Sequence, residues 1–196
     1  MHSLLTKREK EIFSLLTLNK STKQIASELC ISEKTAVSYT HLDVYKRQVV
    51  GDQVTKLIVD HTLALGGSYS IIDNFFYFTY SHNDGGAWGI FSGKMNLFFI
   101  VSIIATIGIV YFFLQSETYQ KITRFGLVLV FCGMIGNLID RVVFGYVRDF
   151  IDFIIFGYDF PIFNVADMAI TIGIFLVILE VGIEEYKAWK ISKSQL

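Results

Sequence analysis

The chain has 196 residues, of which 53% are hydrophobic, and its mean hydropathy of +0.49 argues against an ordinary soluble domain for the whole chain. Residues 1–48 hold eight Lys or Arg and five Asp or Glu, a net charge of +3, whereas residues 49–196 hold nine and thirteen, a net charge of −4. This asymmetry predicts two segments with different roles. Cys30 and Cys132 fall in different segments without the spacing of metal ligands, so we expect neither a cysteine metal site nor a structural disulfide.

The first segment, residues 5–35, has the periodicity of short helices. Apolar side chains recur at three- and four-residue steps, and Ser21 with Gln24 predicts a capping box at a helix start. The pattern resembles the first part of a LuxR-type helix-turn-helix, which reads DNA with its second helix. The resemblance ends after Thr35, where the recognition helix should continue. We therefore interpret residues 1–35 as a partial helix-turn-helix fragment and do not expect it to bind DNA.

Residues 36–48, "AVSYTHLDVYKRQ", fit neither neighbouring segment. The stretch resembles the product of a join made in cloning or assembly, which would make the chain chimeric. The alternative is a genuine linker or helix that connects a regulator to a membrane enzyme. On either interpretation, residues 49–196 form a membrane-embedded domain that is incomplete at its N-terminal side.

Three apolar runs in that domain predict membrane-spanning helices, at Met95–Leu114, Phe125–Ile139 and Val165–Ile183. About 20 apolar residues cross a hydrocarbon core of about 30 Å. Buried helices of a soluble protein are the alternative, but three such runs would leave almost no soluble surface. The expected fold class is therefore a mainly α, polytopic membrane protein.

Basic residues predict the orientation of these spans. Lys121 and Arg124 lie in one short connection, and three more lysines follow the last span, so both stretches are expected in the cytoplasm. The segments on the opposite side are then the ones before Met95 and between Ile139 and Val165. This topology requires a fourth span ahead of Asp52, and no apolar run is present there. The charged residues of a helix in this region would oppose its insertion by about 2.5–3.5 kcal/mol each near mid-membrane.

The two opposite-side segments hold the chemistry. The run "IIDNFFYFTY", residues 71–80, predicts one strand lying at the membrane interface, with its aromatic residues forming an interfacial belt. Asp149 and Asp167 are candidates for a facing pair of carboxyls, of which one keeps a proton while the other activates water. The structural alternatives are a helix cap made by Asn164 with Asp167, and loop ion pairs of Asp140, Asp149 and Asp152 with Arg148 or Arg141.

Five short motifs follow one another from Asp52 to Asp167. They are "DQVTK" (52–56), "NDGGAWG" (83–89), "GNLIDR" (136–141), "VRDFIDF" (147–153) and "FNVAD" (163–167). In this order, and at these places relative to the apolar runs, they resemble the motifs of lipoprotein signal peptidase, also called signal peptidase II.

The resemblance implies a four-span helical architecture, with the first span truncated here and a small β region on the outer side. It implies an intramembrane aspartic endopeptidase that removes signal peptides from bacterial prolipoproteins before a diacylglyceryl-modified cysteine, without a cofactor or metal. Asp149 and Asp167 match the catalytic pair. The residues expected to bind substrate or brace the site are Asp52, Lys56, Asn83, Gly85, Asn137, Asp140, Arg141 and Asn164.

The same resemblance implies a multi-pass protein of the bacterial cytoplasmic membrane, with its active site at the outer face and its C-terminus in the cytoplasm. Prolipoproteins and membrane lipid are the expected partners, and the protein is expected to be a monomer. Two functions from other classes remain alternatives. One is a membrane-anchored transcription regulator, and the other is a small transporter that uses Asp149 and Asp167 as a proton relay.

Overall fold

The computed structural model describes residues 11, 14–15, 18, 20–86, 93–117 and 119–194, so Trp88 of the "NDGGAWG" motif lies outside the described residues. The chain divides into two compact units, Met1–Arg47 and Gln48–Leu196. The expected boundary between a small N-terminal segment and a membrane domain at residue 49 thus falls within two residues of the structural boundary.

The described part of the first unit contains α2 (Thr22–Glu28). The backbone N–H of Gln24 donates to Ser21 Oγ at 3.3 Å, and the backbone N–H of Ser21 donates to Gln24 Oε1 at 2.8 Å, so the predicted capping box is confirmed. Ile25 and Ala26 are buried on one face of this helix. The residues packed against them are Leu15, Leu29 and Ile31.

A long helix, α3 (Glu33–Thr62), follows and carries the chain into the second unit. Its part from Gln48 onward contributes Asp52 and Lys56, both almost fully buried. Since α3 also carries exposed and charged side chains, it is not among the described helices that are apolar enough to cross a membrane.

The three predicted spans are confirmed as α4 (Met95–Gln115), α5 (Lys121–Phe144) and α6 (Val165–Ser194), each long and apolar enough to cross a membrane. The expected end of the middle span at Ile139 was wrong. Helix α5 continues to Phe144 and ends at Gly145, whose φ of +79° makes a left-handed cap, with its N–H donating to the Arg141 carbonyl at 3.2 Å. Asp140 therefore lies inside a helix rather than in a loop.

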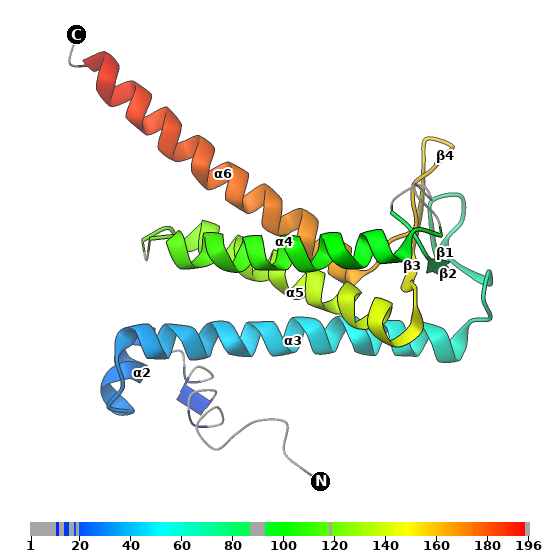
Figure 1. Ribbon diagram of the computed structural model, residues 1–196, viewed down its shortest axis with the longest axis horizontal. Coiled ribbons are helices and arrows are strands. Elements are labelled where there is room, and N and C mark those ends of the chain that lie inside the picture. The colour runs from blue at the N-terminus through cyan, green and yellow to red at the C-terminus, as the bar shows by residue number, and fades with distance from the viewer. Residues whose placement is uncertain are drawn as a thin grey trace. The chain divides into compact units, whose positions relative to one another are not determined.

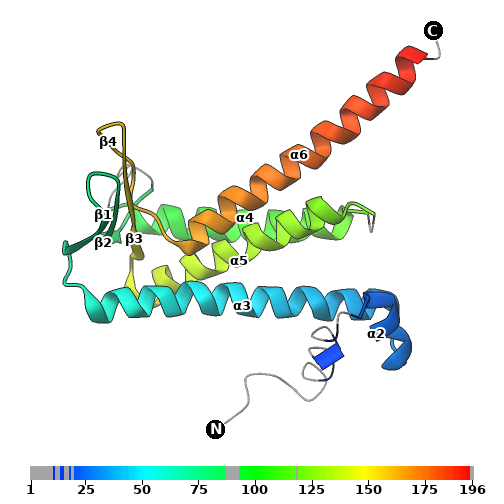
Figure 2. The same ribbon diagram turned by 180° about the vertical axis from the view of Figure 1, so that it is seen from behind.

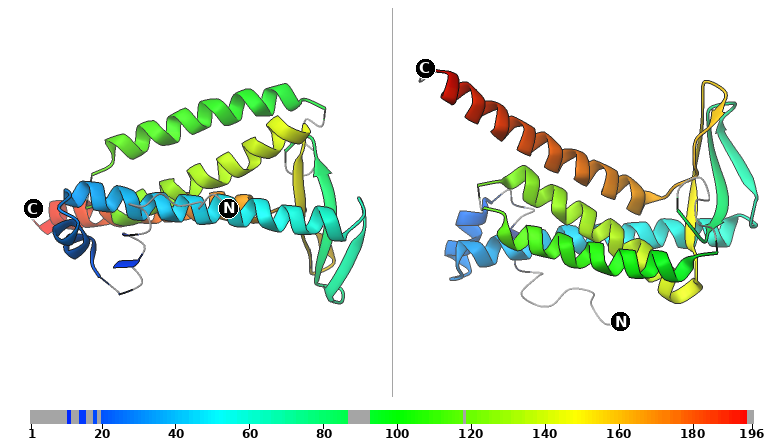
Figure 3. Two further views of the ribbon diagram at one scale, coloured as in Figure 1. Left: turned by 90° about the horizontal axis from the view of Figure 1, so that it is seen from below. Right: turned by 45° about the horizontal axis from the view of Figure 1, so that its top comes forward.

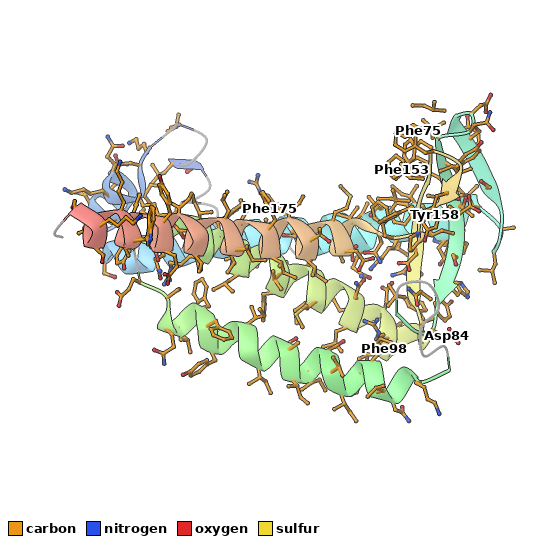
Figure 4. All side chains as sticks on the ribbon, turned by 90° about the horizontal axis from the view of Figure 1, so that it is seen from above. Phe75, Asp84, Phe98, Phe153, Tyr158 and Phe175 are labelled. Atoms are coloured by element: carbon orange, nitrogen blue, oxygen red, sulfur yellow. The ribbon has the colours of Figure 1, made fainter. Side chains whose placement is uncertain are left out.

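Glycines let α5 and α6 approach closely. A Cβ at Gly133 would lie 2.3 Å from the Ala166 carbonyl oxygen, and one at Gly173 would lie 2.4 Å from the Gly126 carbonyl oxygen. Further along α6 the two helices diverge (Figures 1 and 2). The exposed side of α6 carries apolar residues such as Phe175, which Figure 4 labels.

A four-stranded antiparallel sheet lies across one end of these helices (Figures 1 and 3). Its order is β1-β2-β3-β4, and the strands are β1 (Ser68–Ile72), β2 (Phe76–Asn83), β3 (Val147–Ile155) and β4 (Tyr158–Asp159). The expectation of a single strand over residues 71–80 was wrong, because Asp73, Asn74 and Phe75 form a turn. Asn74 has a φ of +59°, a left-handed conformation that asparagine tolerates, and the segment is therefore a hairpin.

The sheet joins the rest of the second unit through an apolar cluster. Val59 of α3 is buried against Tyr80 of β2 and against Phe150 and Ile151 of β3. The Tyr80 hydroxyl also donates to Asp60 Oδ1 at 2.5 Å. This cluster fixes β2 and β3 on α3, and the polar ends of both strands are thereby brought to the start of α6.

Candidate active site

Asp149 and Asp167 open into one cavity of about 280 Å³ at the sheet end of the helices. Asp149 is buried near the start of β3, and Asp167 lies in the first turn of α6. The other residues lining it are Asn83, Gly85, Gly86, Asn137, Arg141, Val147, Phe160, Pro161, Ile162, Phe163, Ile170 and Thr171.

The start of α6 places Asp167. Its carboxylate Oδ2 accepts from the Asn164 backbone N–H at 3.1 Å, while its own N–H donates to Asn164 Oδ1 at 3.1 Å. This is a reciprocal cap of the helix N-terminus. Asp167 therefore caps the helix, as the structural alternative predicted, and also lines the candidate site. Its second carboxylate oxygen, Oδ1, is not used by the cap.

Asn164 touches both carboxylates. Besides its backbone contact with Asp167, its side-chain Nδ2 donates to Asp149 Oδ1 at 2.5 Å. The other oxygen of Asp149 accepts from Asn83 Nδ2 at 2.9 Å, and the Gly85 N–H donates to Asn83 Oδ1 at 3.0 Å. Asn83, Gly85 and Asn164 were predicted to bind substrate or brace the site, and in the described structure they hold Asp149.

Asn137 relays the charge of Lys56 toward Asp167. Lys56 Nζ donates to Asn137 Oδ1 at 2.9 Å, and Asn137 Nδ2 donates to Asp167 Oδ1 at 2.7 Å. Since an ammonium can only donate, it requires the amide oxygen of Asn137 on its side. The amide NH₂ group of Asn137 must then face Asp167. Lys56 thus sets the orientation of the Asn137 amide, although Lys56 itself does not line the cavity.

Buried opposite charges brace this arrangement from behind. Lys56 Nζ lies 2.9 Å from Asp52 Oδ2 and 3.4 Å from Asp140 Oδ2. Asp52 Oδ1 in turn accepts from the Ala166 backbone N–H at 2.9 Å, which ties α3 to the first turn of α6. Asp52, Lys56 and Asp140 lie away from the cavity and stabilise the helices that carry it.

Three residues that the sequence analysis did not assign to the site belong to this network. Arg148 Nη2 lies 2.8 Å from Asp140 Oδ1, which confirms the ion pair considered for Asp140. Gln53 Nε2 donates to Asp140 Oδ1 at 3.0 Å and to the Gly136 carbonyl at 3.1 Å. A Cβ at Gly136 would lie 2.6 Å from Asp52 Oδ2. Gln53 and Gly136 belong to the motifs "DQVTK" and "GNLIDR", and this membership could have indicated from the sequence that they are part of the site.

Arg141 differs from the other basic residues of the site because it faces the cavity. Its guanidinium lies 5.7 Å from the centre of the Phe98 ring, and its Nε is buried without a hydrogen-bond partner among the described residues. Arg141 thus lines the cavity together with the two carboxylates and has one unpartnered donor, Nε, among the described residues. This placement suits contact with a carbonyl group of a bound molecule better than the bracing role expected for it.

Burial and a second negative charge act together on Asp149. Removal from water, and after it the neighbouring charge of Asp167, raise its pKa to about 7 against the lowering effect of the hydrogen bonds from Asn83 and Asn164. Such a carboxyl holds a proton near neutral pH. Within the described residues, no group of three or more His, Cys, Asp or Glu side chains is placed to hold a metal ion. The arrangement is suited to acid–base chemistry on a water molecule.

Comparison with known proteins divides the chain at the same place as the structure. Residues 47–183 match the family described as Signal peptidase (SPase) II, and residues 3–46 match Bacterial regulatory proteins, luxR family. We expected the luxR-type resemblance to end after Thr35, but the match continues to residue 46.

Relatives and solved structures agree with the larger match. Lipoprotein signal peptidases of Staphylococcus aureus strains MRSA252 and JH9 are each 50% identical over 131 residues, which is 67% of this chain and 80% of theirs. Two structures described as a bacterial membrane enzyme, solved by the in meso method at 2.3 and 1.9 Å, are 47% identical and cover 72% of this chain. Their TM-scores are 0.68 and 0.66, over 87% and 92% of their own chains. With its five motifs and its two carboxylates all inside the matched segment, the chain belongs to the signal peptidase II family.

Proposed function

We propose that residues 47–183 form an intramembrane aspartic endopeptidase that removes signal peptides from prolipoproteins, cutting before a diacylglyceryl-modified cysteine. Membership of the signal peptidase II family supports the substrate class. The observation that carries the catalytic type is the position of Asn164. This one residue donates to Asp149 and to Asp167, so both carboxyls border the same cavity.

The two carboxyls have complementary roles in the proposed reaction. Asp167 lies at a helix N-terminus, whose positive end favours its ionised form, and it acts as the base. Asp149, with a pKa raised to about 7, starts as the acid. Since two close carboxyls titrate together, the shared proton belongs to the pair.

Hydrolysis follows from this protonation state. Asp167 takes a proton from water as the water oxygen attacks the scissile carbonyl carbon, and Asp149 gives its proton to the carbonyl oxygen. Collapse of the tetrahedral intermediate returns that proton to Asp149 and breaks the C–N bond. The leaving nitrogen takes the proton held on Asp167, so the pair ends as it began. In this proposal Arg141, which lines the cavity, donates to the substrate backbone during these steps.

The location of the site supports a substrate that stays in the membrane. The cavity lies at one end of three helices that are able to cross a bilayer, beside the sheet (Figure 3). Basic residues gather toward the other end of these helices, at Lys121, Arg124 and the C-terminal lysines of α6. By the positive-inside rule, we propose that the site faces the outer side of the bacterial cytoplasmic membrane.

The test is cleavage of a lipid-modified prolipoprotein in detergent or vesicles by the Asp149→Asn and Asp167→Asn variants. Loss of an essential acid or base is expected to lower the rate by about 10²–10⁴-fold. Asp152→Asn is the matched control, because Asp152 lies on the same strand but accepts from Thr79 Oγ1 at 2.6 Å and does not line the cavity.

The control is expected to retain most of the parent rate. Retained cleavage in both dyad variants would exclude the aspartic mechanism. Proton-coupled uptake into vesicles, lost with the same substitutions, would instead support the transporter alternative.

A further inference from the structure

The turn between β3 and β4 exposes an aromatic side chain completely. Ile155 pairs with Tyr158, so the hairpin loop consists of Phe156 and Gly157 alone. Both have positive φ, +52° and +79°, as a type I′ turn requires. Phe156 has a relative exposed area of 105%, the highest value of any described large hydrophobic residue.

Phenylalanine is a poor choice for this backbone conformation. A left-handed residue with a bulky side chain costs about 1–2 kcal/mol relative to glycine, and asparagine is the residue that type I′ turns favour at this position. The chain uses that residue in its other hairpin, where Asn74 has a φ of +59°. In water, the fully exposed Phe156 ring gains no burial that would offset this cost, which favours a contact outside the chain.

The surroundings of Phe156 are apolar as well. The stretch Phe153–Tyr158 contains no charged residue. Ile155 and Tyr158 are both exposed next to Phe156. Phe75 of the neighbouring turn is also exposed, and its ring packs 5.4 Å from that of Phe153. Figure 4 labels Phe75, Phe153 and Tyr158 close together in this part of the sheet.

The position of the hairpin identifies what it contacts. The sheet crosses the ends of α4 and α6, and the β3–β4 hairpin projects sideways beyond these helix ends (Figures 1 to 3). When the spans cross a bilayer, their ends lie at the level of the lipid headgroups. The hairpin then lies at this same level and beside the bundle rather than above it.

We propose that the β3–β4 hairpin, residues Ile155–Tyr158, is an anchor that inserts into the bilayer surface through Phe156. Aromatic side chains prefer this interfacial region, and apolar groups of surface-bound segments lie about 5–10 Å into the boundary between headgroups and acyl chains. The same lipid that surrounds the apolar outer faces of the membrane helices would thus contact the hairpin. The anchor also leads directly into Phe160 and Pro161, which line the cavity, so it holds one wall of the site at the level of the lipid.

The depth of residue 156 in a bilayer tests this proposal. The full chain with Phe156→Cys and Cys30→Ser is labelled with an environment-sensitive fluorophore, because Cys30 is exposed whereas Cys132 is buried. It is then reconstituted in phosphatidylethanolamine and phosphatidylglycerol vesicles that contain nitroxide lipids of different depth. We expect blue-shifted emission, loss of emission with a shallow nitroxide, less loss with a deep one, and weak quenching by aqueous iodide.

Two outcomes would overturn the anchor. Strong iodide quenching without nitroxide quenching would place the tip in water. Blue-shifted emission that rises with protein concentration and ignores the nitroxide lipids would instead indicate contact with a second copy of the chain.

A matched pair of variants separates anchoring from turn stability. With the label moved to Tyr158→Cys, proteins with Phe156 and with Phe156→Asn are compared. Because asparagine suits the turn, Phe156→Asn is expected to unfold in detergent at the same or a higher temperature. In vesicles it is expected to lose part of the shallow nitroxide quenching. Equal quenching in the two proteins would show that Phe156 is not the anchor.

Discussion

At the scale of single residues, Asp149 couples the site to the stability of the fold. Its pKa rises from an ordinary value of 3.8 to about 7, mainly because it is buried. Between these two pH values the native protein holds a proton that the unfolded chain has released. Raising the pH through this range therefore lowers the free energy of unfolding, by about 1.4 kcal/mol for each unit of pKa shift.

The Asp149→Asn variant should remove this dependence, because an amide has no proton to lose. We expect the unfolding temperature of the detergent-solubilised parent to fall between about pH 5 and pH 8 more steeply than that of the variant. The difference in slope is the informative quantity, since the substitution also changes the hydrogen bonds with Asn83 and Asn164. Thermal unfolding curves at several pH values measure it, and parallel curves would contradict the raised pKa.

Residue type made Asp149 and Asp167 candidates for a pair, because carboxylates are costly inside a membrane unless they have a function. The amides beside them were expected only from the resemblance to signal peptidase II. The sequence did not reveal which groups face the cavity. Arg141 faces it and Lys56 does not, although both are basic residues within the motifs. That distinction depends on packing between helices that are far apart in the sequence.

At the scale of elements, the close approach of α5 and α6 positions the site. Gly133 lies against the Ala166 carbonyl, in the helical turn that also carries Asp167. Gly133→Ala would force the two helices apart, and overpacking of this kind costs about 1–3 kcal/mol. We expect a lower unfolding temperature, and a loss of cleavage larger than the loss of folded protein, because the turn that carries Asp167 must move.

Gly108→Ala on α4 is the control for this prediction. A Cβ at Gly108 would meet nothing within 4 Å, so this substitution is expected to be neutral or to stabilise the helix. Equal effects of the two substitutions on unfolding temperature and cleavage would show that the contact between Gly133 and Ala166 does not position the site.

The elements themselves were predictable to different degrees. Long apolar runs predicted α4, α5 and α6, because a bilayer requires length and hydrophobicity and little else. The β1–β2 hairpin was missed, because Asp73 and Asn74 interrupt a run of apolar and aromatic residues that otherwise reads as one strand. Asp and Asn are typical turn residues and indicated a turn here, but the prediction gave more weight to the aromatic residues on both sides.

At the scale of the whole molecule, the boundary between the two family matches coincides, to within one residue, with the boundary between the two structural units. The luxR-type match ends at residue 46, the signal peptidase II match begins at 47, and the structure divides between Arg47 and Gln48. Every residue of the candidate site lies beyond this point. The two segments thus have separate matches and separate cores. That they are independent parts joined near residues 36–48 stays a prediction.

This junction leads to a prediction about membrane insertion. Helix α3 contributes only residues 48–62 to the second unit, about 22 Å of helix at 1.5 Å per residue, against a hydrocarbon core of about 30 Å. Lys46 and Arg47 stand directly before this part, and each opposes insertion by about 2.5–3.5 kcal/mol near mid-membrane. We therefore expect the chain to insert α4, α5 and α6 but to leave α3 incompletely inserted.

Replacing residues 36–48 with an apolar leucine–alanine segment of the same length should correct this defect, because residues 36–62 would then form a helix long enough to span. Protease protection in inner-membrane vesicles is expected to increase for α3, and cleavage of a lipid-modified prolipoprotein should rise with it. A glycine–serine replacement of equal length removes the same charges without adding hydrophobicity and should give no such gain. A parent chain that already shows four fully protected spans would contradict the prediction, and α3 would then be a working first span despite its charges.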